Sequence, residues 1–518
     1  YGIQNAGGSY AYRRENGTTA ETTGFPKPVA DDIINCALDM ENSKLYLGIN
    51  GTYYSQSGAT GDPAAGTNAT FSSLVSDIYL PFNEYRGSSQ ESRANFGQNS
   101  SFGSTETSGS AAAQDSDEKG DFYYTPPTDF LALCTDNLPT PEIALPESEA
   151  FNTIIWSGSG AGSGGGSAGN RALTGVGFQP DLVWGKQRTD QTNYPHIWVD
   201  SVRTPPWQLY SSSNSIQYEG DAAGNLASLD SDGFSTTEGA AGNLYWNRSG
   251  STFVAWNWKA GGAPTATNSA TSGAMDANSV ALNGSLQATY TPSGSPSIYP
   301  SKMSINTTNG ISIVQYTGTG SAATIPHGLG VKPAMMFIKK LDATDEMIVW
   351  GKDMHGDSTL NAVKMNGASY VSSSTFWNSN DPDEDVLHIG TSGFTGASNT
   401  YICYVVAEIP GFSRVLNYLP GTAYDGTFLH TGFKPAFWMT KMTDGPDGGG
   451  SWFLWDNRRG PYNLNKPYLV PDQLYVDETG SNGWDFLSNG LKMRMSISQN
   501  TTIAIAFAES PFKYSNAR

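Results

Sequence analysis

The acid–base chemistry open to this chain centres on one short acidic loop. Its carboxylates stand close together in the sequence: Asp381, Asp383, Glu384 and Asp385. A pair of carboxylates can hydrolyse a glycosidic bond when the two groups lie about 5–10 Å apart across the sugar. Neighbouring positions of one loop point their side chains in different directions. The pattern therefore favours a solvated acidic loop over a catalytic pair.

A calcium site is the second candidate. Asp230-Ser231-Asp232-Gly233 begins like an EF-hand loop, but the twelfth position is Ala241 rather than glutamate, and no helix flanks it. A β-turn is the favoured interpretation, with calcium as the alternative. The histidines lack HxxxH or HxH spacing, and the cysteines, each in an apolar strand-like context, lack a CxxC pair: Cys36, Cys134 and Cys403. We predict buried free thiols, no metal, no cofactor and no enzymatic activity.

Aromatic rings supply the remaining chemistry. The chain has 13 Trp, 26 Tyr and 22 Phe, and several of these rings lie in polar, turn-rich segments. Flat exposed rings stack on sugar faces, and neighbouring Asn, Asp and Ser side chains can bond the sugar hydroxyls. Packing in a core or between modules is the alternative for each ring. The candidate ligand-binding residues are Trp207, Tyr210, Tyr245, Trp246, Trp377, Tyr462 and Trp484.

An internal repeat predicts the strands that must position these residues. Three times a glycine–proline corner opens onto an apolar strand, at 177–184, 330–337 and 432–439. Self-similarity of this kind indicates a tandem array of one module. The corner prolines are Pro180, Pro333 and Pro435. A lysine follows each proline by six residues and is expected to be a solvated charge at a strand end, with ligand contact as the alternative: Lys186, Lys339 and Lys441.

A charged pair also recurs. Asp200 and Arg203 of the first repeat return as Asp456 and Arg459 of the third, whereas Gly351 occupies the aspartate position of the second. Residues shared by copies of a scaffold usually maintain that scaffold. We therefore predict an internal salt bridge or a strand-end cap, with a catalytic pair as the alternative.

Composition and strand patterning predict an all-β, multi-domain protein of tandem β-sandwiches. Glycine is abundant, and charged residues make up only 15% of the chain. At about 105 residues, each repeat has the size of a sandwich or jelly roll. The expected segments are a sandwich at 1–125, a Pro-rich bridge at 126–150, repeat 1 at 151–261, a Ser/Thr/Gly-rich linker or surface excursion at 262–309, repeat 2 at 310–412 and repeat 3 at 413–518.

Charge and hydropathy exclude two classes of partner. The formal net charge of −19 argues against nucleic acid, because phosphate binding needs clustered Lys and Arg. No apolar run reaches the length of about 18 residues that a membrane-spanning helix needs, so we expect no membrane insertion. The chain opens at Tyr1 inside strand-like sequence, and we expect the protein to continue upstream.

The first segment resembles the SPRY family. The resemblance is carried by an aliphatic strand ending in an acidic residue, a leucine–aromatic strand start, an asparagine–glycine turn and an asparagine–phenylalanine–glycine segment. These are Ala37-Leu38-Asp39, Leu45-Tyr46, Asn50-Gly51 and Asn95-Phe96-Gly97. The resemblance covers the later half of a usual SPRY unit and implies a bent, concanavalin-like β-sandwich.

The chain as a whole is similar to fibre-like virion proteins of tailed bacteriophages, especially those of marine cyanobacterial phages. Repeat 1 carries their motifs most closely, and repeats 2 and 3 diverge, with Ser488-Asn489-Gly490 replacing the acidic turn of repeat 3. The matching segments are 177–184, 200–203, 230–234, 254–261 and the bridge phrase 124–139.

The phage resemblance implies a structural protein on the surface of a virion. The implied role is that of a tail-fibre or tailspike-type adhesin that forms a homotrimer, contacts other virion proteins and binds a host-surface glycan. A capsid-decorating or baseplate component without a host ligand is the alternative. A polysaccharide depolymerase is less favoured, because the chain lacks the short-period repeat of a parallel β-helix.

Overall fold

The computed structural model describes residues 2–4, 11–15, 18–74, 93–106, 113–160, 170–189, 194–354, 358–367, 370–393, 395–444, 450–497 and 499–515. Strands hold 40% of the described residues and helices 3%, which confirms the all-β prediction. The chain forms two compact units, Tyr1–Pro139 and Thr140–Arg518. Among the helices of the described ranges, none is long and apolar enough to cross a membrane.

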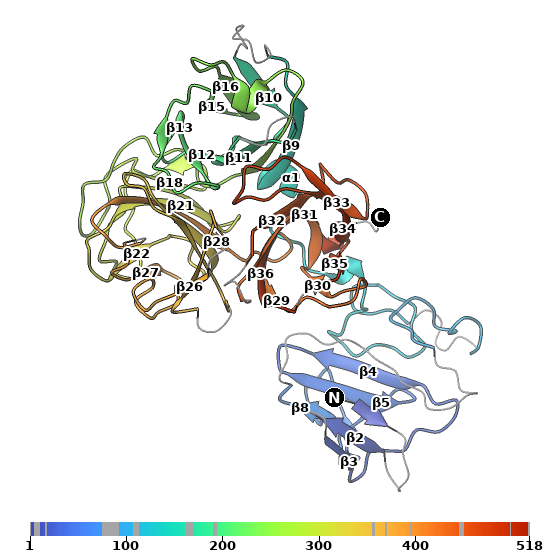
Figure 1. Ribbon diagram of the computed structural model, residues 1–518. Helices are drawn as coiled ribbons and strands as arrows, with labels where there is room; N and C mark the ends of the chain where they lie inside the picture. The colour runs from blue at the N-terminus through green and yellow to red at the C-terminus, as the bar shows by residue number, and fades with distance from the viewer. Residues whose placement is uncertain are drawn as a thin grey trace. The chain divides into compact units, whose positions relative to one another are not determined.

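The N-terminal unit contains two antiparallel sheets (Figure 1). One has the order β1-β2-β3, and the other has the order β4-β5-β6-β7 with β8 paired to β5. The bounds are β1 Gly2–Gln4, β2 Tyr12–Glu15, β3 Thr18–Glu21, β4 Ile34–Asp39, β5 Lys44–Ile49, β6 Thr52–Tyr54, β7 Thr60–Gly61, β8 Phe71–Ser72 and the 3₁₀ turn η1 Thr135–Asn137.

Turn chemistry explains the hairpins of this unit. Asn50 and Gly51 both have positive φ, as a tight two-residue turn between β5 and β6 requires. Tyr46 of β5 is buried and packs edge-on against Phe130. The strand-like sequence at 77–82 lies outside the described residues.

The three cysteines differ in exposure. Cys403 is buried in a strand, as expected, whereas Cys36 and Cys134 are exposed, and all three are free thiols. Cys36 lies on β4, the edge strand of its sheet, where one side of the strand lacks a neighbour among the described strands. The adjacent Ala37 is buried, so Cys36 lies on the opposite face of β4, which is open to water.

The C-terminal unit contains the three repeats, and each forms two sheets. In repeat 1 the inner sheet has the order β14-β13-β12-β11-β17-β9 and the outer sheet β10-β16-β15. The bounds are α1 Pro146–Glu149, β9 Phe151–Ser157, β10 Arg171–Thr174, β11 Leu182–Gln187, β12 Ile197–Asp200, β13 Trp207–Tyr210, β14 Tyr218–Glu219, β15 Asn225–Asp230, β16 Gly233–Thr237, α2 Leu244–Asn247 and β17 Thr252–Trp258.

Repeat 2 has a nine-stranded inner sheet, β19-β18-β20-β21-β28-β23-β24-β25-β26, and a second sheet, β22-β27. The bounds are β18 Val280–Leu282, β19 Ser285–Leu286, β20 Lys302–Asn306, β21 Ile311–Thr317, β22 Ala323–Pro326, β23 Pro333–Lys340, β24 Met347–Gly351, β25 Asn361–Lys364, β26 Tyr370–Ser372, β27 Val386–Ile389 and β28 Thr400–Ala407.

Residues 262–309 are part of this sandwich rather than a linker or a surface excursion. Strands β18, β19 and β20 extend the inner sheet by three strands, and β18 pairs in parallel with β20. Apolar residues of this segment are few, but they are buried in the core of repeat 2: Met275, Val280, Ile298, Met303 and Ile305. A sparse set of apolar side chains is enough for short strands at the end of an existing sheet.

Repeat 3 has an inner sheet of order β29-β36-β31-β32 and an outer sheet of order β30-β35-β34-β33. The bounds are β29 Ser413–Tyr418, β30 Phe428–His430, β31 Phe433–Met442, β32 Phe453–Asp456, β33 Asn465–Tyr468, β34 Glu478–Leu487, β35 Gly490–Arg494, β36 Thr502–Pro511 and the 3₁₀ turn η2 Phe512–Tyr514.

The repeated corner has the same role in all three copies. Its first residue is a glycine with positive φ in each: Gly177, Gly330 and Gly432. The strand that follows, β11, β23 or β31, pairs antiparallel with the closing strand of its repeat, β17, β28 or β36. Register shifts occur beside Pro333 and Pro435, because proline cannot donate to the ladder.

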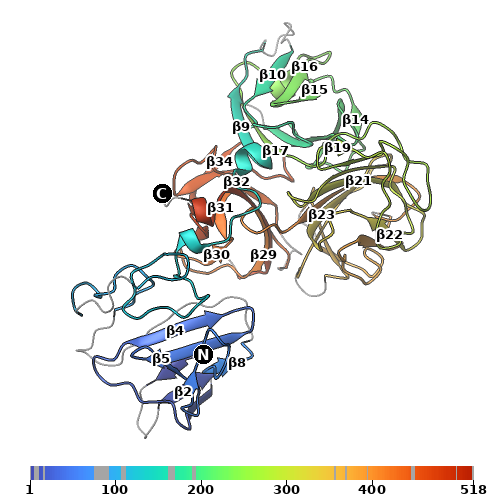
Figure 2. The ribbon, with the colours of Figure 1, turned by 180° about the vertical axis from the view of Figure 1, so that it is seen from behind.

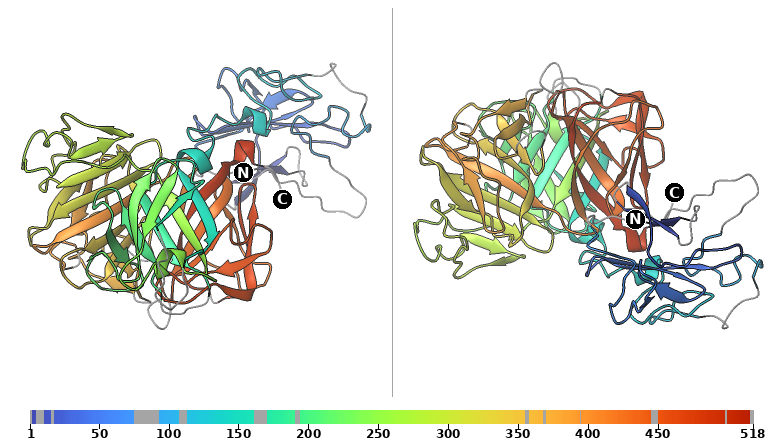
Figure 3. Two further views of the ribbon diagram at one scale, coloured as in Figure 1. Left: turned by 90° about the horizontal axis from the view of Figure 1, so that it is seen from above. Right: turned by 90° about the horizontal axis from the view of Figure 1, so that it is seen from below.

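The inner sheets of the three repeats surround one shared core (Figures 1 and 2). In both views of Figure 3, repeats 2 and 3 lie on either side of repeat 1. Side chains alternate along each strand, so Trp184 joins the shared core while Val183 faces the outer sheet of its own repeat. A cavity of about 40 Å³ at the centre is lined by four side chains from each repeat: Leu182, Trp184, Trp198, Trp258, Ile311, Phe337, Tyr404, Val406, Phe437, Met439, Ile505 and Phe507.

Candidate functional site

Three of the aromatic rings proposed for ligand binding belong to cores instead. Trp246, Trp377 and Trp484 are at most 1% exposed. The Trp246 ring lies over Gly185 of β11, where a Cβ atom would collide with it. Trp377 Nε1 donates to the Asn361 carbonyl at 2.8 Å, and Trp484 packs edge-on against another tryptophan. Polar neighbours in the sequence therefore did not indicate exposure.

Two other predicted residues remain at least partly accessible but stand apart from one another. Trp207 is half-buried at the start of β13, where it pairs with Glu219 of β14. Tyr462 is 80% exposed in the segment between β32 and β33 of repeat 3.

Tyr210 and Tyr245, the remaining two predicted residues, belong to a group of four rings in repeat 1, which we call the tyrosine cluster: Tyr194, Tyr210, Tyr218 and Tyr245. Tyr210 stacks on Tyr218 with ring centroids 5.0 Å apart. Tyr245 meets Tyr210 and Tyr194 edge-on, at 6.3 Å and 5.4 Å. Tyr218 is exposed and the other three are half-buried, so the cluster presents edges and faces of rings to solvent.

Different elements bring these rings together. Tyr210 ends β13, Tyr218 begins β14, Tyr245 lies on the short helix α2, and Tyr194 precedes β12. The Tyr245 backbone N–H donates to the Ala223 carbonyl at 2.9 Å, which fixes α2 beside the turn before β15. Tyr194 and Tyr218 had no motif that singled them out, because the four rings are spread over more than 50 residues.

Charged and polar groups complete the cluster. The Tyr210 hydroxyl donates to Asp221 Oδ2 at 2.7 Å, and Arg248 donates to the Tyr194 hydroxyl at 3.1 Å. Burial, reinforced by the Asp221 charge, raises the pKa of Tyr245 to about 12. The pKa of Tyr210 is also raised, first by burial and then by its bond to Asp221. The hydroxyls of Tyr210 and Tyr245 therefore stay protonated near neutral pH and take part in hydrogen bonds.

The three repeat lysines are buried rather than solvated. Each donates to carbonyls on both sides of a boundary between two repeats, which we call a seam. The carbonyls of the lysine's own repeat belong to Tyr194, Asp345 and Gly450. Those across the seams are Leu474 of repeat 3 for Lys186, Asn214 of repeat 1 for Lys339 and Gly367 of repeat 2 for Lys441, at 3.2, 3.0 and 3.0 Å.

The lysine of repeat 2 bonds repeat 1, the lysine of repeat 3 bonds repeat 2, and the lysine of repeat 1 bonds repeat 3. The three contacts therefore link the repeats in a ring. Burial lowers the lysine pKa to about 7 for Lys186 and to about 8 for Lys339 and Lys441. The spacing after the proline places each lysine on the strand face that carries the shared core. In the sequence each lysine stands at the end of an apolar strand, which predicts a solvated side chain. The side chain is buried because the neighbouring repeat covers it.

The recurring Asp–Arg pairs also lie at seams. Arg203 and Asp200 form a fully buried ion pair, and the Tyr404 hydroxyl of repeat 2 donates to Asp200 Oδ2 at 2.8 Å. Arg459 and Asp456 form the equivalent pair, and Trp256 Nε1 of repeat 1 donates to Asp456 Oδ2 at 3.0 Å. Each aspartate thus accepts a hydrogen bond from an aromatic ring on the closing strand of the next repeat.

The third seam lies between repeats 2 and 3. At the position where the other two seams have a buried aspartate, it has Gly351 and is apolar. Gly351 pairs with Met335 in the same register in which Asp200 pairs with Leu182. A Cβ atom at Gly351 would collide with the Ile503 side chain of repeat 3. The loss of the aspartate in repeat 2 is therefore matched by an aliphatic side chain across the seam.

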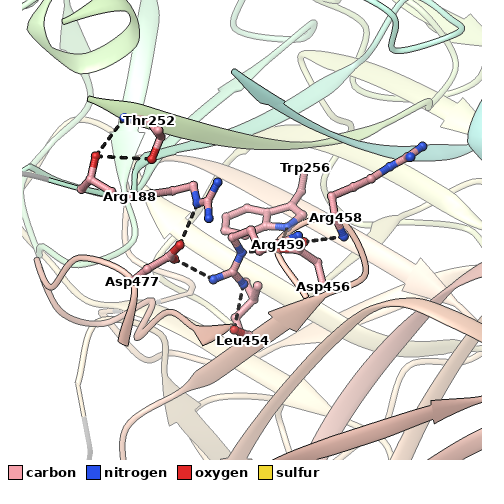
Figure 4. A network of polar contacts seen from close by, with 9 residues as sticks. Arg188, Thr252, Trp256, Leu454, Asp456, Arg458, Arg459 and Asp477 are labelled. Carbon is pink, nitrogen blue, oxygen red and sulfur yellow. Dashed lines mark hydrogen bonds and ion pairs between the residues drawn. The ribbon is translucent and has the colours of Figure 1, made fainter. Parts of the chain in front are cut away.

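The seam between repeats 1 and 3 carries a polar network of several charged side chains (Figure 4). Asp477 of repeat 3 bridges Arg188 of repeat 1, at 2.7 Å, and Arg459, at 2.9 Å. The Arg459 guanidinium lies over the Trp256 ring at 5.5 Å and also donates to the Leu454 carbonyl. Each guanidinium nitrogen of Arg459 donates to a protein acceptor, Nε to Asp456, Nη1 to Asp477 and Nη2 to Leu454, which indicates a role in joining the repeats.

The acidic candidates are occupied by local hydrogen bonds. Asp232 accepts from the backbone N–H groups of Gly175 and Gly177, so the 230–233 segment forms the β15–β16 turn. In the acidic loop, Asp383 accepts two backbone N–H groups, and Asp385 accepts from Ser293. Within the described residues, no group of three or more His, Cys, Asp or Glu side chains could hold a metal ion.

Comparison with known proteins identifies the C-terminal unit. The family model described as a domain of unknown function, DUF7483, matches residues 146–296 and 287–511, which together cover more than half of the chain. Neither a curated protein nor a solved structure matches the sequence. The two matched ranges together include strands of all three repeats. The chain therefore belongs to the DUF7483 family of domains of unknown function.

Proposed function

We propose that this protein lies on the surface of a bacteriophage virion and is a tail-fibre or tailspike-type adhesin that binds a host-cell glycan. The virion assignment rests on the resemblance of the repeat 1 motifs to fibre-like phage proteins. The observation that carries glycan binding is the tyrosine cluster. It combines partly exposed ring surface with protonated hydroxyls, a carboxylate and a guanidinium, which suit the apolar faces and the hydroxyls of a sugar.

The proposal is for binding without catalysis. Asp221 is the carboxylate that bonds a ring of the cluster, and a glycoside hydrolase would need a pair across the scissile bond. The acidic loop lies in repeat 2, where Asp383 and Asp385 are held by backbone and side-chain donors. The alternative function, a decorating or baseplate component, is favoured by the seams, because the residues that recur between repeats serve to join the repeats.

Tyr218→Ala is expected to weaken glycan binding about tenfold. Losing one stacking ring removes about 1–1.5 kcal/mol, which corresponds to about a tenfold rise in Kd. Tyr218 is the most exposed ring of the cluster, so the substitution should leave the fold intact. Binding is measured with the purified chain on a host-glycan array and on intact host cells, with free sugar as competitor.

The matched control is Tyr462→Ala, which removes an exposed tyrosine of repeat 3 and should leave binding unchanged. Equal binding by wild type and Tyr218→Ala would remove the cluster from the proposal. No binding by folded wild-type protein would favour the decorating or baseplate role.

The homotrimer that the resemblance implies is tested by sedimentation equilibrium of the full chain. Three copies of the repeat already surround a common core within one chain, and the side chains of that core are buried. A homotrimer would therefore form through surfaces outside this core. A mass of three chains supports the proposed trimer, and a single-chain mass contradicts it.

A further inference from the structure

Repeat 3 contains a compact triad of Lys434, Glu509 and Asn457. Lys434 Nζ lies 2.6 Å from Glu509 Oε1, and Asn457 Nδ2 donates to Glu509 Oε2 at 2.8 Å. One carboxylate thus contacts both an amine and a carboxamide. Lys434 and Asn457 are 7% and 6% exposed, so both groups are largely withdrawn from water.

Three neighbouring strands hold the triad. Lys434 lies on β31, Glu509 lies on the adjacent β36, and Asn457 directly follows β32 on the other side of β31. The Asn457 backbone N–H donates to the Ala436 carbonyl of β31 at 2.9 Å. A register shift between Lys434 and Pro435 occurs at the same point of β31. The backbone therefore sets the three side chains against one another.

We propose that Lys434 and Asn457 become joined by an intramolecular isopeptide bond, with Glu509 as the catalytic acid–base. The Glu509 carboxylate takes a proton from the lysine ammonium, and the neutral Nζ attacks Cγ of Asn457. Protonated Glu509 donates a proton to the carboxamide as the Cγ–Nδ2 bond breaks. The new bond is Nζ–Cγ, and ammonia leaves, carrying away the remaining proton as ammonium.

The bond-forming step needs no oxidant or further reactant. An ammonium and a carboxamide become a substituted amide and an ammonium ion, and Glu509 ends as it began. The first proton transfer turns two charged groups into two neutral ones, and the 2.6 Å contact between Lys434 and Glu509 supplies its path. Glu509 contacts both Lys434 and Asn457, so it can take the proton from the lysine and pass it to the carboxamide without moving.

Repeat 2 provides an internal comparison. Lys352 follows Gly351 in the position that Asn457 occupies after Asp456, and Lys352 Nζ lies 2.6 Å from Glu408. In repeat 2 the Glu408 carboxylate therefore contacts an amine at the position where repeat 3 has the Asn457 carboxamide. Without a carboxamide at this position, no isopeptide bond can form there. Repeat 2 packs in the same way without the carboxamide, so the full triad is specific to repeat 3.

The test is the intact mass of the purified full chain by electrospray mass spectrometry. The wild-type chain should be lighter than its sequence mass by one ammonia molecule, and tandem spectra of a digest should show the peptides of Lys434 and Asn457 linked. Lys434→Arg keeps the positive charge but should restore the full sequence mass. Glu509→Gln should do the same, because it removes the acid–base group. Wild-type protein at its full sequence mass would overturn the proposal.

Two further variants separate chemistry from folding. Asn457→Asp should still link but lose water instead of ammonia, a mass change that a merely structural contact would not produce. Lys352→Arg, at the repeat 2 pair, should leave the ammonia loss unchanged. An ammonia loss that digestion maps to residues other than Lys434 and Asn457 would also overturn the proposal.

Discussion

Arg459→Ala is expected to lower the free energy of unfolding by about 3–5 kcal/mol, because it leaves a buried carboxylate without its partner. Asp456 and Arg459 are both fully buried at the seam between repeats 1 and 3. Arg459 also bonds Asp477 and the Leu454 carbonyl and covers the Trp256 ring, so the substitution removes four contacts at once. Urea denaturation of the full chain, followed by tryptophan fluorescence, measures the change.

The neighbouring Arg458 is the matched control. Its side chain is 43% exposed and forms a surface ion pair with Glu147 at 3.1 Å. Exposed pairs of this kind contribute about 0–1 kcal/mol, so Arg458→Ala should change stability little. Equal effects of the two substitutions would show that the buried network does not hold the seam together.

Stability is expected to rise with pH between about 7 and 9. Lys186, Lys339 and Lys441 have folded-state pKa values of about 7, 8 and 8. The unfolded chain keeps the ordinary lysine pKa of about 10.4. In this window the unfolded state binds more protons than the folded state, so raising the pH favours folding. The slope is at most about 1.4 kcal/mol per pH unit for each lysine.

Burial is the main cause of these lowered lysine pKa values, and nearby carboxylates partly oppose it: Asp477 for Lys186, Asp345 and Glu346 for Lys339, and Asp472 for Lys441. Above about pH 10 the sign reverses. Half-buried tyrosines with raised pKa values, such as Tyr245, then keep protons that the unfolded chain loses. The full profile should therefore pass through a maximum.

Lys339→Met should remove about a quarter of the rise in the free energy of unfolding between pH 7 and 9, because Lys186, with the lowest pKa, contributes the largest share. The measurement is the free energy of unfolding by urea at pH 7, 8 and 9. Lys332→Met is the control, because this lysine is exposed and pairs with Asp381 at the surface. The mechanism fails if the wild-type stability is flat over this range, or if Lys332→Met alters the slope as much as Lys339→Met.

Local sequence patterns determined the β architecture. The glycine of each corner needs positive φ, and the apolar run after the proline needs cover on both faces. Those two requirements predict strands such as β23 at the right place. The Asp200–Arg203 ion pair was also predictable, because its members are three residues apart and bond within one turn. Such features depend on contacts between near neighbours in the chain.

Tertiary structure alone decided which surfaces stay in water. Lys186 is buried because Leu474, almost 300 residues away, lies across the seam, and Trp246 is buried because α2 folds onto β11. The tyrosine cluster and the Lys434–Glu509–Asn457 triad likewise join residues from separate strands. Burial and proximity arise when sheets pack on both faces, and a one-dimensional pattern does not encode which distant segment covers a given side chain.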